Sequence, residues 1–145
     1  MKTLKLMVII MIGVLPACSR TPEPIQYGKD ACAHCRMTIM DKRFAAEIVT
    51  AKGKVFKFDA AECLAGFLKE NTGIGSNEKS IFLVSAFNHP GRFIDAKKSF
   101  FLNDNSLSSP MGGNLAAFSS QSYAEARGKG KTAKIYNWPQ LLKSR

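Results

Sequence analysis

The chain has 145 residues, of which 46% are hydrophobic and 22% charged, with 21 lysines and arginines against 11 aspartates and glutamates. These values fit one small globular domain or two very small ones, and they exclude a collagen-like, coiled-coil or largely disordered chain. The formal net charge of +10 favours anionic lipid headgroups or an acidic partner protein. Because the lysines are scattered, a solvated basic surface without a specific partner is the alternative.

The N-terminus indicates export, and we therefore expect no nucleic-acid partner. Lys2 and Lys5 precede an uncharged run of ten residues, 6–15. Ten residues make about 15 Å of helix, half of a ~30 Å hydrocarbon core, so this run is typical of a signal peptide and not of a membrane span. The expected boundaries are residues 1–17 for the signal peptide, 18–30 for a lipidated, proline-containing tether and 31–145 for the folded domain.

Residues 15–18 (LPAC) resemble the bacterial lipobox, in which a small residue precedes a cysteine that is lipidated and becomes the first residue of the mature protein. The resemblance implies cleavage after Ala17 and a diacylglyceryl anchor on Cys18. The alternative is an ordinary signal peptide that is cut near Ala17. We therefore expect an anchor on the periplasmic side of a bacterial membrane. Because Ser19, and not Asp, follows the cysteine, we favour the outer membrane over the inner membrane.

The first elements after the tether form a hairpin and a helix. Residues 44–51 and 54–58 carry β-branched and aromatic side chains around a Lys-Gly turn, which predicts two paired strands. Asp59 is expected to cap the following helix, with Glu62 in capping-box position, because apolar residues recur at helical spacing over 60–70. These elements make one ββα unit.

The second half repeats this order weakly. In both halves a phenylalanine and an N-cap residue, Phe58-Asp59 and Phe118-Ser119, precede a helix. The expected fold is α+β, with two small similar ββα units of antiparallel strands at about residues 31–78 and 79–145. The further elements expected are strands at 81–87, 92–96, 99–102, 114–118 and 131–136, a polar loop at 103–113, a helix that Ser119 caps and that ends at Arg127, and a terminal turn at 137–139.

Cysteine and methionine supply the candidate ligands. With Cys18 assigned to the anchor, Cys32, Cys35 and Cys63 remain in an oxidising compartment. Three is an odd number, so at least one thiol is unpaired or binds a ligand. Soft thiolate and thioether ligands select Cu(I), whereas Zn²⁺ prefers cysteine and histidine.

The pattern favours Cys35 and Met37 as ligands of one ion, because residues i and i+2 of an extended segment point to the same side. Met111 is the best third ligand, since it lies on a loop that the next two glycines leave free to move. Cys32 and Cys63 are less certain. Cys63 lies on the apolar face of its predicted helix, which is typical of a plain buried thiol.

Two other chemistries stay open. Cys32-x-x-Cys35 has the spacing of a thiol-disulfide site, although in thioredoxin-like proteins that motif opens a helix after a strand. His34 can complete a structural Zn²⁺ site with the three cysteines. The sequence has no recognisable acid–base pair, nucleophile–base pair or phosphate loop, so an enzyme is not predicted.

The segment Cys32-Ala-His-Cys35-Arg-Met37-Thr-Ile39 resembles the NosL family, the copper-binding lipoproteins that accompany nitrous oxide reductase. The resemblance extends to the lipobox, to a cysteine in the helix after Phe-Asp and to Ser-Pro-Met111-Gly. It implies two similar ββα-type units, copper bound through Cys35, Met37 and Met111, and delivery of Cu(I) to nitrous oxide reductase together with its copper-assembly machinery. It leaves open whether the recipient is that enzyme or another copper enzyme.

Overall fold

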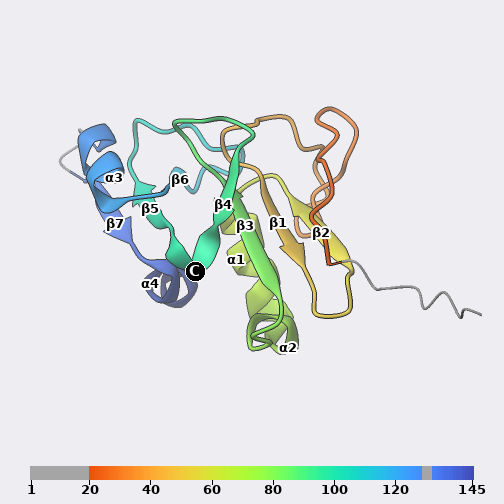
Figure 1. Ribbon diagram of the computed structural model, residues 1–145. Helices are drawn as coiled ribbons and strands as arrows, with labels where there is room; N and C mark the ends of the chain where they lie inside the picture. Colours follow the sequence, from red (N-terminus) through yellow and green to blue (C-terminus); the bar gives the residue numbers. More distant parts are fainter. Residues whose placement is uncertain (1–19, 129–131) are drawn as a thin grey trace, which may run out of the picture.

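The computed structural model describes residues 20–128 and 132–145. Figure 1 shows two antiparallel sheets with α1 between them. The first sheet contains β1 (Ala46–Val49), β2 (Val55–Phe58), β3 (Ile81–Ser85) and β4 (Phe93–Asp95), with α1 (Ala61–Glu70), α2 (Thr72–Gly75) and the 3-10 turn η1 (Ala96–Lys98). The second contains β5 (Phe100–Asn103), β6 (Leu115–Phe118) and β7 (Lys134–Tyr136), with α3 (Gln121–Arg127) and α4 (Trp138–Ser144).

The predicted α+β class with two similar units is confirmed. The strand orders are β2-β1-β3-β4 and β6-β5-β7, and every strand pair is antiparallel. In each sheet a hairpin is followed by a helix, and the next strand then pairs with the first strand of the hairpin. A parallel bridge between Ala86 and Ala117 joins the two units, with the Phe87 N–H donating to the Ala117 carbonyl at 2.9 Å.

The chain passes from one sheet to the other at η1, and the expected division at residues 78–79 is wrong. β3 pairs with β1 through Val84 and Ala46, and β4 pairs back onto β3 through Ile94. Both strands therefore complete the first sheet. The sequence pattern assigned them to the second unit because it carries no signal for which strand pairs with which.

Helix caps differ from the predicted ones where a side chain has a tertiary partner. The N-cap of α1 is Ala60, whose side chain cannot cap the helix. The expected capping residues bond elsewhere: Asp59 accepts from the Met40 N–H, and Glu62 accepts from Ser109. Ser120, one residue later than expected, caps α3 by accepting from the Tyr123 N–H. The expected terminal turn is the helix α4, because Asn137 forms a capping box with the residue three positions later.

The segment expected to be a tether packs on the first sheet from Glu23 onward. Ile25 is buried in the core. Lys57 donates from Nζ to the Pro24 carbonyl at 3.0 Å and to Asp30 at 2.9 Å. The folded part of the chain therefore begins before residue 31. The signal peptide, the lipidation of Cys18 and the role of Ser19 lie outside the described residues.

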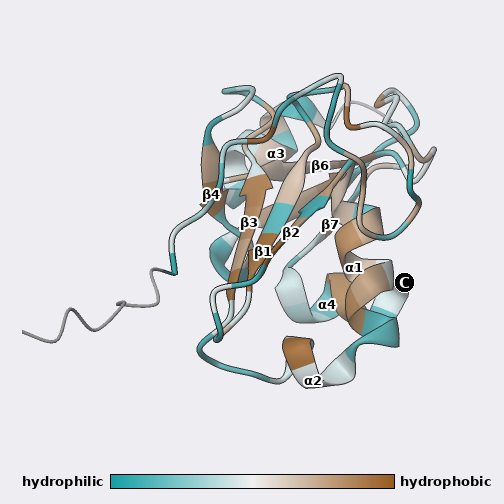
Figure 2. Cartoon of the chain, turned by 90° about the vertical axis from the view of Figure 1, so that its right-hand side faces the viewer, coloured by the Kyte–Doolittle hydropathy of each residue, from teal (hydrophilic) through white to brown (hydrophobic). Residues whose placement is uncertain are grey.

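The main core lies where α1 meets both sheets. Apolar residues concentrate in the strands and on α1, and the loops mix hydrophilic with apolar residues (Figure 2). α1 packs against β1, β6 and α4, which brings its first turn near the long loop between β5 and β6. Among the described helices, none is long and apolar enough to cross a bilayer.

Candidate metal centre

Three cysteine sulfurs meet at the first turn of α1. The sulfur atoms of Cys32, Cys35 and Cys63 all lie within 4.8 Å of one another, and the three thiols are free. A metal–sulfur bond of about 2.3 Å, as in zinc thiolates, places two ligands on opposite sides of an ion about 4.6 Å apart. One ion can therefore contact all three sulfurs with little movement of the chain.

The 32–37 loop is closed on itself and attached to β2. The Cys32 N–H donates to the Met37 carbonyl at 2.8 Å, and the Arg36 N–H donates to the Cys32 carbonyl at 3.0 Å. The Ala33 N–H donates to the carbonyl of Lys57 in β2, also at 2.8 Å. These bonds fix the first two cysteines against the end of the sheet.

The extended geometry expected for Cys35 and Met37 is wrong. Arg36 between them has a φ of 67°, a left-handed conformation that turns the chain and removes the alternation of a strand. The Met37 N–H instead donates to the Cys35 sulfur. The Met37 side chain is 52% exposed, so its thioether is accessible from solvent.

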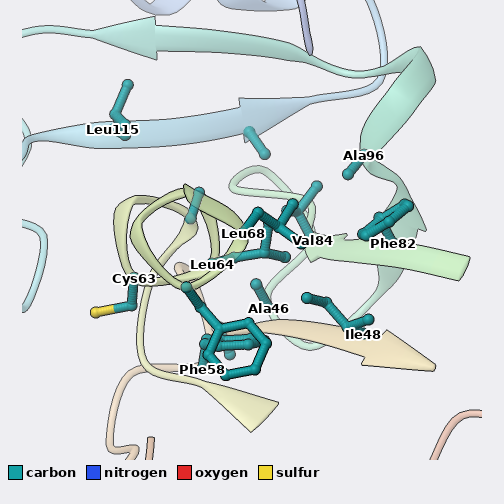
Figure 3. Close-up of a cluster of buried hydrophobic side chains, with 14 of the residues drawn as sticks. Ala46, Ile48, Phe58, Cys63, Leu64, Leu68, Phe82, Val84, Ala96 and Leu115 are labelled. Atoms are coloured by element: carbon teal, nitrogen blue, oxygen red, sulfur yellow. The ribbon is translucent and has the colours of Figure 1, made fainter. Parts of the chain in front are cut away.

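Cys63 belongs to this cluster and is not a plain core thiol. It is 1% exposed. Figure 3 shows its sulfur on the side of α1 away from Phe82 and Val84, pointing out of the apolar cluster. The sequence pattern placed the residue correctly on the buried face of the helix. The pattern did not indicate what covers Cys63, which is the 32–37 loop and not another apolar side chain.

The cluster holds one stabilised thiolate. The Cys63 thiol and the backbone N–H groups of Asp59, Cys35 and His34 donate hydrogen bonds to Cys32, which lower its pKa to about 4. The pKa of Cys63 is raised because its thiol donates to the Cys32 sulfur and is buried. Burial raises the pKa of Cys35. At neutral pH the centre therefore carries one negative charge and two thiol protons.

His34 lies along α1 and outside the 4.8 Å group. Its Nδ1 is 3.5 Å from a carboxylate oxygen of Glu70, and its ring packs on Gly66 so closely that a Cβ there would lie 2.7 Å from Nε2. The four-ligand Zn²⁺ site considered from the sequence is not assembled in this conformation.

Met111 lies on a tight turn, and the loop that carries it is hydrogen-bonded to itself and to α1. Ser109 donates to Glu62, its hydroxyl accepts from the Asn114 N–H at 2.8 Å, and its carbonyl accepts from the Gly112 N–H at 3.0 Å. Glu62 directly precedes Cys63 in α1. The turn therefore holds Met111, which is 43% exposed, beside the helix end that carries the third sulfur.

Two carboxylates at this end of α1 were not recognised from the sequence as part of the site. Asp59 is buried, accepts from the Met40 N–H, and has a pKa raised by burial. One oxygen of Asp59 and one of Glu62 are buried with no hydrogen-bond partner among the described atoms. The spacing of Asp59 and Glu62 fits a helix cap as well as it fits a place in the site. Nothing in the sequence therefore distinguished capping from a role in the site.

The chain matches the profile of a known family and is similar in fold to a solved structure. The profile of the NosL family matches residues 24–143. The crystal structure of the copper chaperone NosL from Shewanella denitrificans is similar in fold, with a TM-score of 0.72 and 22% sequence identity over 88% of this chain and 99% of that chain. No curated protein sequence matches. Because the family profile covers most of the chain, this protein belongs to the NosL family.

Proposed function

We propose that this protein is a Cu(I) chaperone that carries its ion on the three clustered sulfurs and passes it to a recipient protein. The observation that supports this most directly is the preformed group of Cys32, Cys35 and Cys63, within 4.8 Å and with one thiolate already stabilised. Thiolates are the ligands that a soft monovalent ion prefers, and a centre without a fourth thiolate or imidazole ligand can release its metal.

The mixed exposure of the sulfurs suits transfer. Cys32 and Cys63 are buried, whereas Cys35 is half-buried and therefore reaches both the ion and a partner. The exposed thioethers of Met37 and Met111 are weaker, neutral ligands that can hold Cu(I) while one thiolate is exchanged for a ligand of the recipient. Each step replaces one sulfur of this site by one ligand of the recipient, so the ion is never released into water.

The recipient of the copper and the attachment to the membrane complete the proposed function. Family membership supports delivery to nitrous oxide reductase and its copper-assembly machinery, and the lipobox supports a lipid anchor on the periplasmic side of the membrane. Family membership also supports a carrier with no catalytic activity of its own.

A competition titration with a chromogenic Cu(I) chelator tests the ligand set. We expect Cys32→Ser, Cys35→Ser and Cys63→Ser each to lower the affinity by at least about 100-fold, and Met37→Ala and Met111→Ala by about tenfold. Met40→Ala is the matched control, because Met40 is an exposed methionine of the same segment, 67% exposed, and is not assigned to the ion. Unchanged affinity in the cysteine variants contradicts the proposed site.

Thiol-disulfide exchange is the second candidate, since the low pKa of Cys32 is typical of a reactive thiol. Burial of Cys32 argues against it, because the nucleophile must reach its substrate. Insulin reduction by the chain, abolished by Cys32→Ser and kept by Met37→Ala, would favour this alternative over copper transfer.

A further inference from the structure

A surface groove lies at the end of the first sheet away from the sulfurs. It has a volume of about 390 Å³ and is lined by residues of the β1–β2 turn, of α2 and of the link into β3, within 50–56 and 73–80. Its lining is mostly apolar, with Phe56 and Ile74 in the wall and Lys52 and Lys54 at the turn. We call it the anchor-end groove.

The strand register separates the groove from the metal centre. Val49 of β1 pairs with Ile81 at the groove end, and Ala46 pairs with Phe58 at the other end, next to α1 and Cys63. Three residues of strand make about 10 Å. Figures 1 and 2 both place α2 at the bottom of the molecule, below the strands of the first sheet.

The described chain begins at this groove. The guanidinium of Arg20 donates to the Lys79 carbonyl at 3.3 Å, and Lys79 directly precedes Ser80 of the groove lining. Cys18 lies two residues before Arg20, and two extended residues span at most about 7 Å. If Cys18 carries the anchor, as the proposed function holds, the membrane surface lies next to this groove.

The charges around the groove are mainly positive. Arg20, Lys52, Lys54 and Lys79 are exposed, and no ion pair among the described residues engages them. Glu78 is the single acidic side chain in the 73–80 segment. A surface of this kind attracts the phosphates of anionic lipids, with about a fivefold gain in binding for each basic residue near the membrane.

We propose that the anchor-end groove binds anionic phospholipid of the membrane that holds the anchor. The cations contact the phosphate, and the apolar wall of Phe56 and Ile74 receives the glycerol and first acyl carbons. Lys54 already lies over the Phe56 ring, with Nζ 4.6 Å from the centroid, so cation and apolar surface are adjacent. The groove end of the first sheet then contacts the membrane, and the three sulfurs face away from the bilayer toward a recipient.

Vesicle cosedimentation tests the proposal with a chain that starts at Ser19, which lacks the acyl chains. Every buried residue of the described core lies between Ile25 and Leu141, so this chain keeps its core. The vesicles contain phosphatidylcholine alone or with phosphatidylglycerol. The test variant is Lys52→Glu with Lys54→Glu. The matched control is Lys134→Glu with Lys143→Glu, the same charge change at another surface hollow, on the second sheet.

We expect salt-sensitive binding to the phosphatidylglycerol vesicles alone, at least about tenfold weaker in the test variant and little changed in the control. Ile74→Ser, which keeps every charge, should weaken binding about threefold. Equal losses in both double variants, no binding by the unsubstituted chain, or equal binding to soluble polyglutamate would overturn the proposal, the last in favour of an acidic protein. Cu(I) affinity of the test variant should be unchanged, which separates this inference from the metal site.

Discussion

Ser109 donates a hydrogen bond to Glu62, the residue that precedes Cys63 of the three-sulfur cluster. This contact joins the loop between β5 and β6 of the second sheet to the first turn of α1, the helix that follows β2 of the first sheet. It ties the turn that carries Met111 to the end of the helix that carries Cys63. The candidate ligands therefore come from three separate segments whose relative positions depend on how the two units pack.

Ser109→Ala should loosen the Met111 turn. The substitution leaves a carboxylate oxygen of Glu62 and the Asn114 N–H without their partner, and we expect a loss of about 1–3 kcal/mol in the free energy of unfolding. Cu(I) affinity should fall about as much as in Met111→Ala. Urea unfolding and chelator competition measure the two effects. Ser108→Ala, at an exposed neighbour, is the control and should change neither.

The stability of the metal-free protein should depend on pH through the sulfur cluster. The pKa of Cys32 is lowered to about 4, so its thiolate stabilises the fold fully above the ordinary thiol pKa of about 8.5, and this contribution is lost as pH falls through about 4. The raised pKa of Cys63 acts in the opposite direction, because the unfolded chain ionises this thiol more easily above about pH 8.5. Stability from this pair should therefore rise from pH 4 to about 8 and then fall.

Anaerobic urea unfolding at several pH values checks this profile. The quantity to compare is the difference in the free energy of unfolding between the unsubstituted chain and Cys32→Ser, because the titration of carboxylates and lysines cancels in that difference. A difference that stays flat between pH 4 and 8 would show that Cys32 is protonated in the fold. The same thiolate predicts that coordination of Cu(I) by the three cysteines at neutral pH releases about two protons and not three. Titration in buffers of different ionisation enthalpy measures that number.

Arg36→Gly should stabilise the protein. Arg36 has a φ of 67°, which costs an L-residue about 1–2 kcal/mol and a glycine almost nothing. Glycine also gives the unfolded chain more entropy, so the expected net gain is about 0.5–1 kcal/mol. Arg36→Ala keeps the strain and should show no gain. If glycine and alanine have the same effect in urea unfolding, backbone strain at this position is not released.

Lys57→Met should free the segment at 23–30 from the sheet. Its Nζ bonds to Pro24 and Asp30 and lies 3.6 Å from Glu23, so removal of the charge should cost about 1–3 kcal/mol. Limited proteolysis should then cleave before residue 31, while the rest of the domain remains resistant. Lys52→Met, at an exposed turn, is the control and should leave the cleavage pattern unchanged.

Local patterns in the sequence predicted most of the secondary structure. The hairpin of β1 and β2, the helix α1 and the repeat of this order in β5, β6 and α3 all follow from alternation, helical spacing and turn residues. Pairing between distant strands did not follow, because β3 and β4 have no local feature that assigns them to a sheet. The caps at Asp59 and Glu62 were wrong for the same reason: their partners lie far away in the sequence.

The sequence identified the three cysteines as candidate ligands, but it did not predict the geometry of the loops around them. Cys35, Met37 and Met111 were chosen for their chemistry, but the left-handed turn at Arg36 and the fixed turn before Gly112 cannot be read from residue types. Cys63 was underestimated because a cysteine on the apolar face of a helix has the same pattern whether apolar side chains or other sulfurs cover it.

X-ray absorption spectroscopy of the chain loaded anaerobically with one Cu(I) tests the central claim most directly. The account predicts a first shell dominated by sulfur, with fewer sulfur neighbours when Cys63→Ala is loaded in the same way. Met40→Ala should give the spectrum of the unsubstituted chain. A first shell made only of nitrogen and oxygen, or an identical sulfur shell in Cys63→Ala, would contradict the three-sulfur centre.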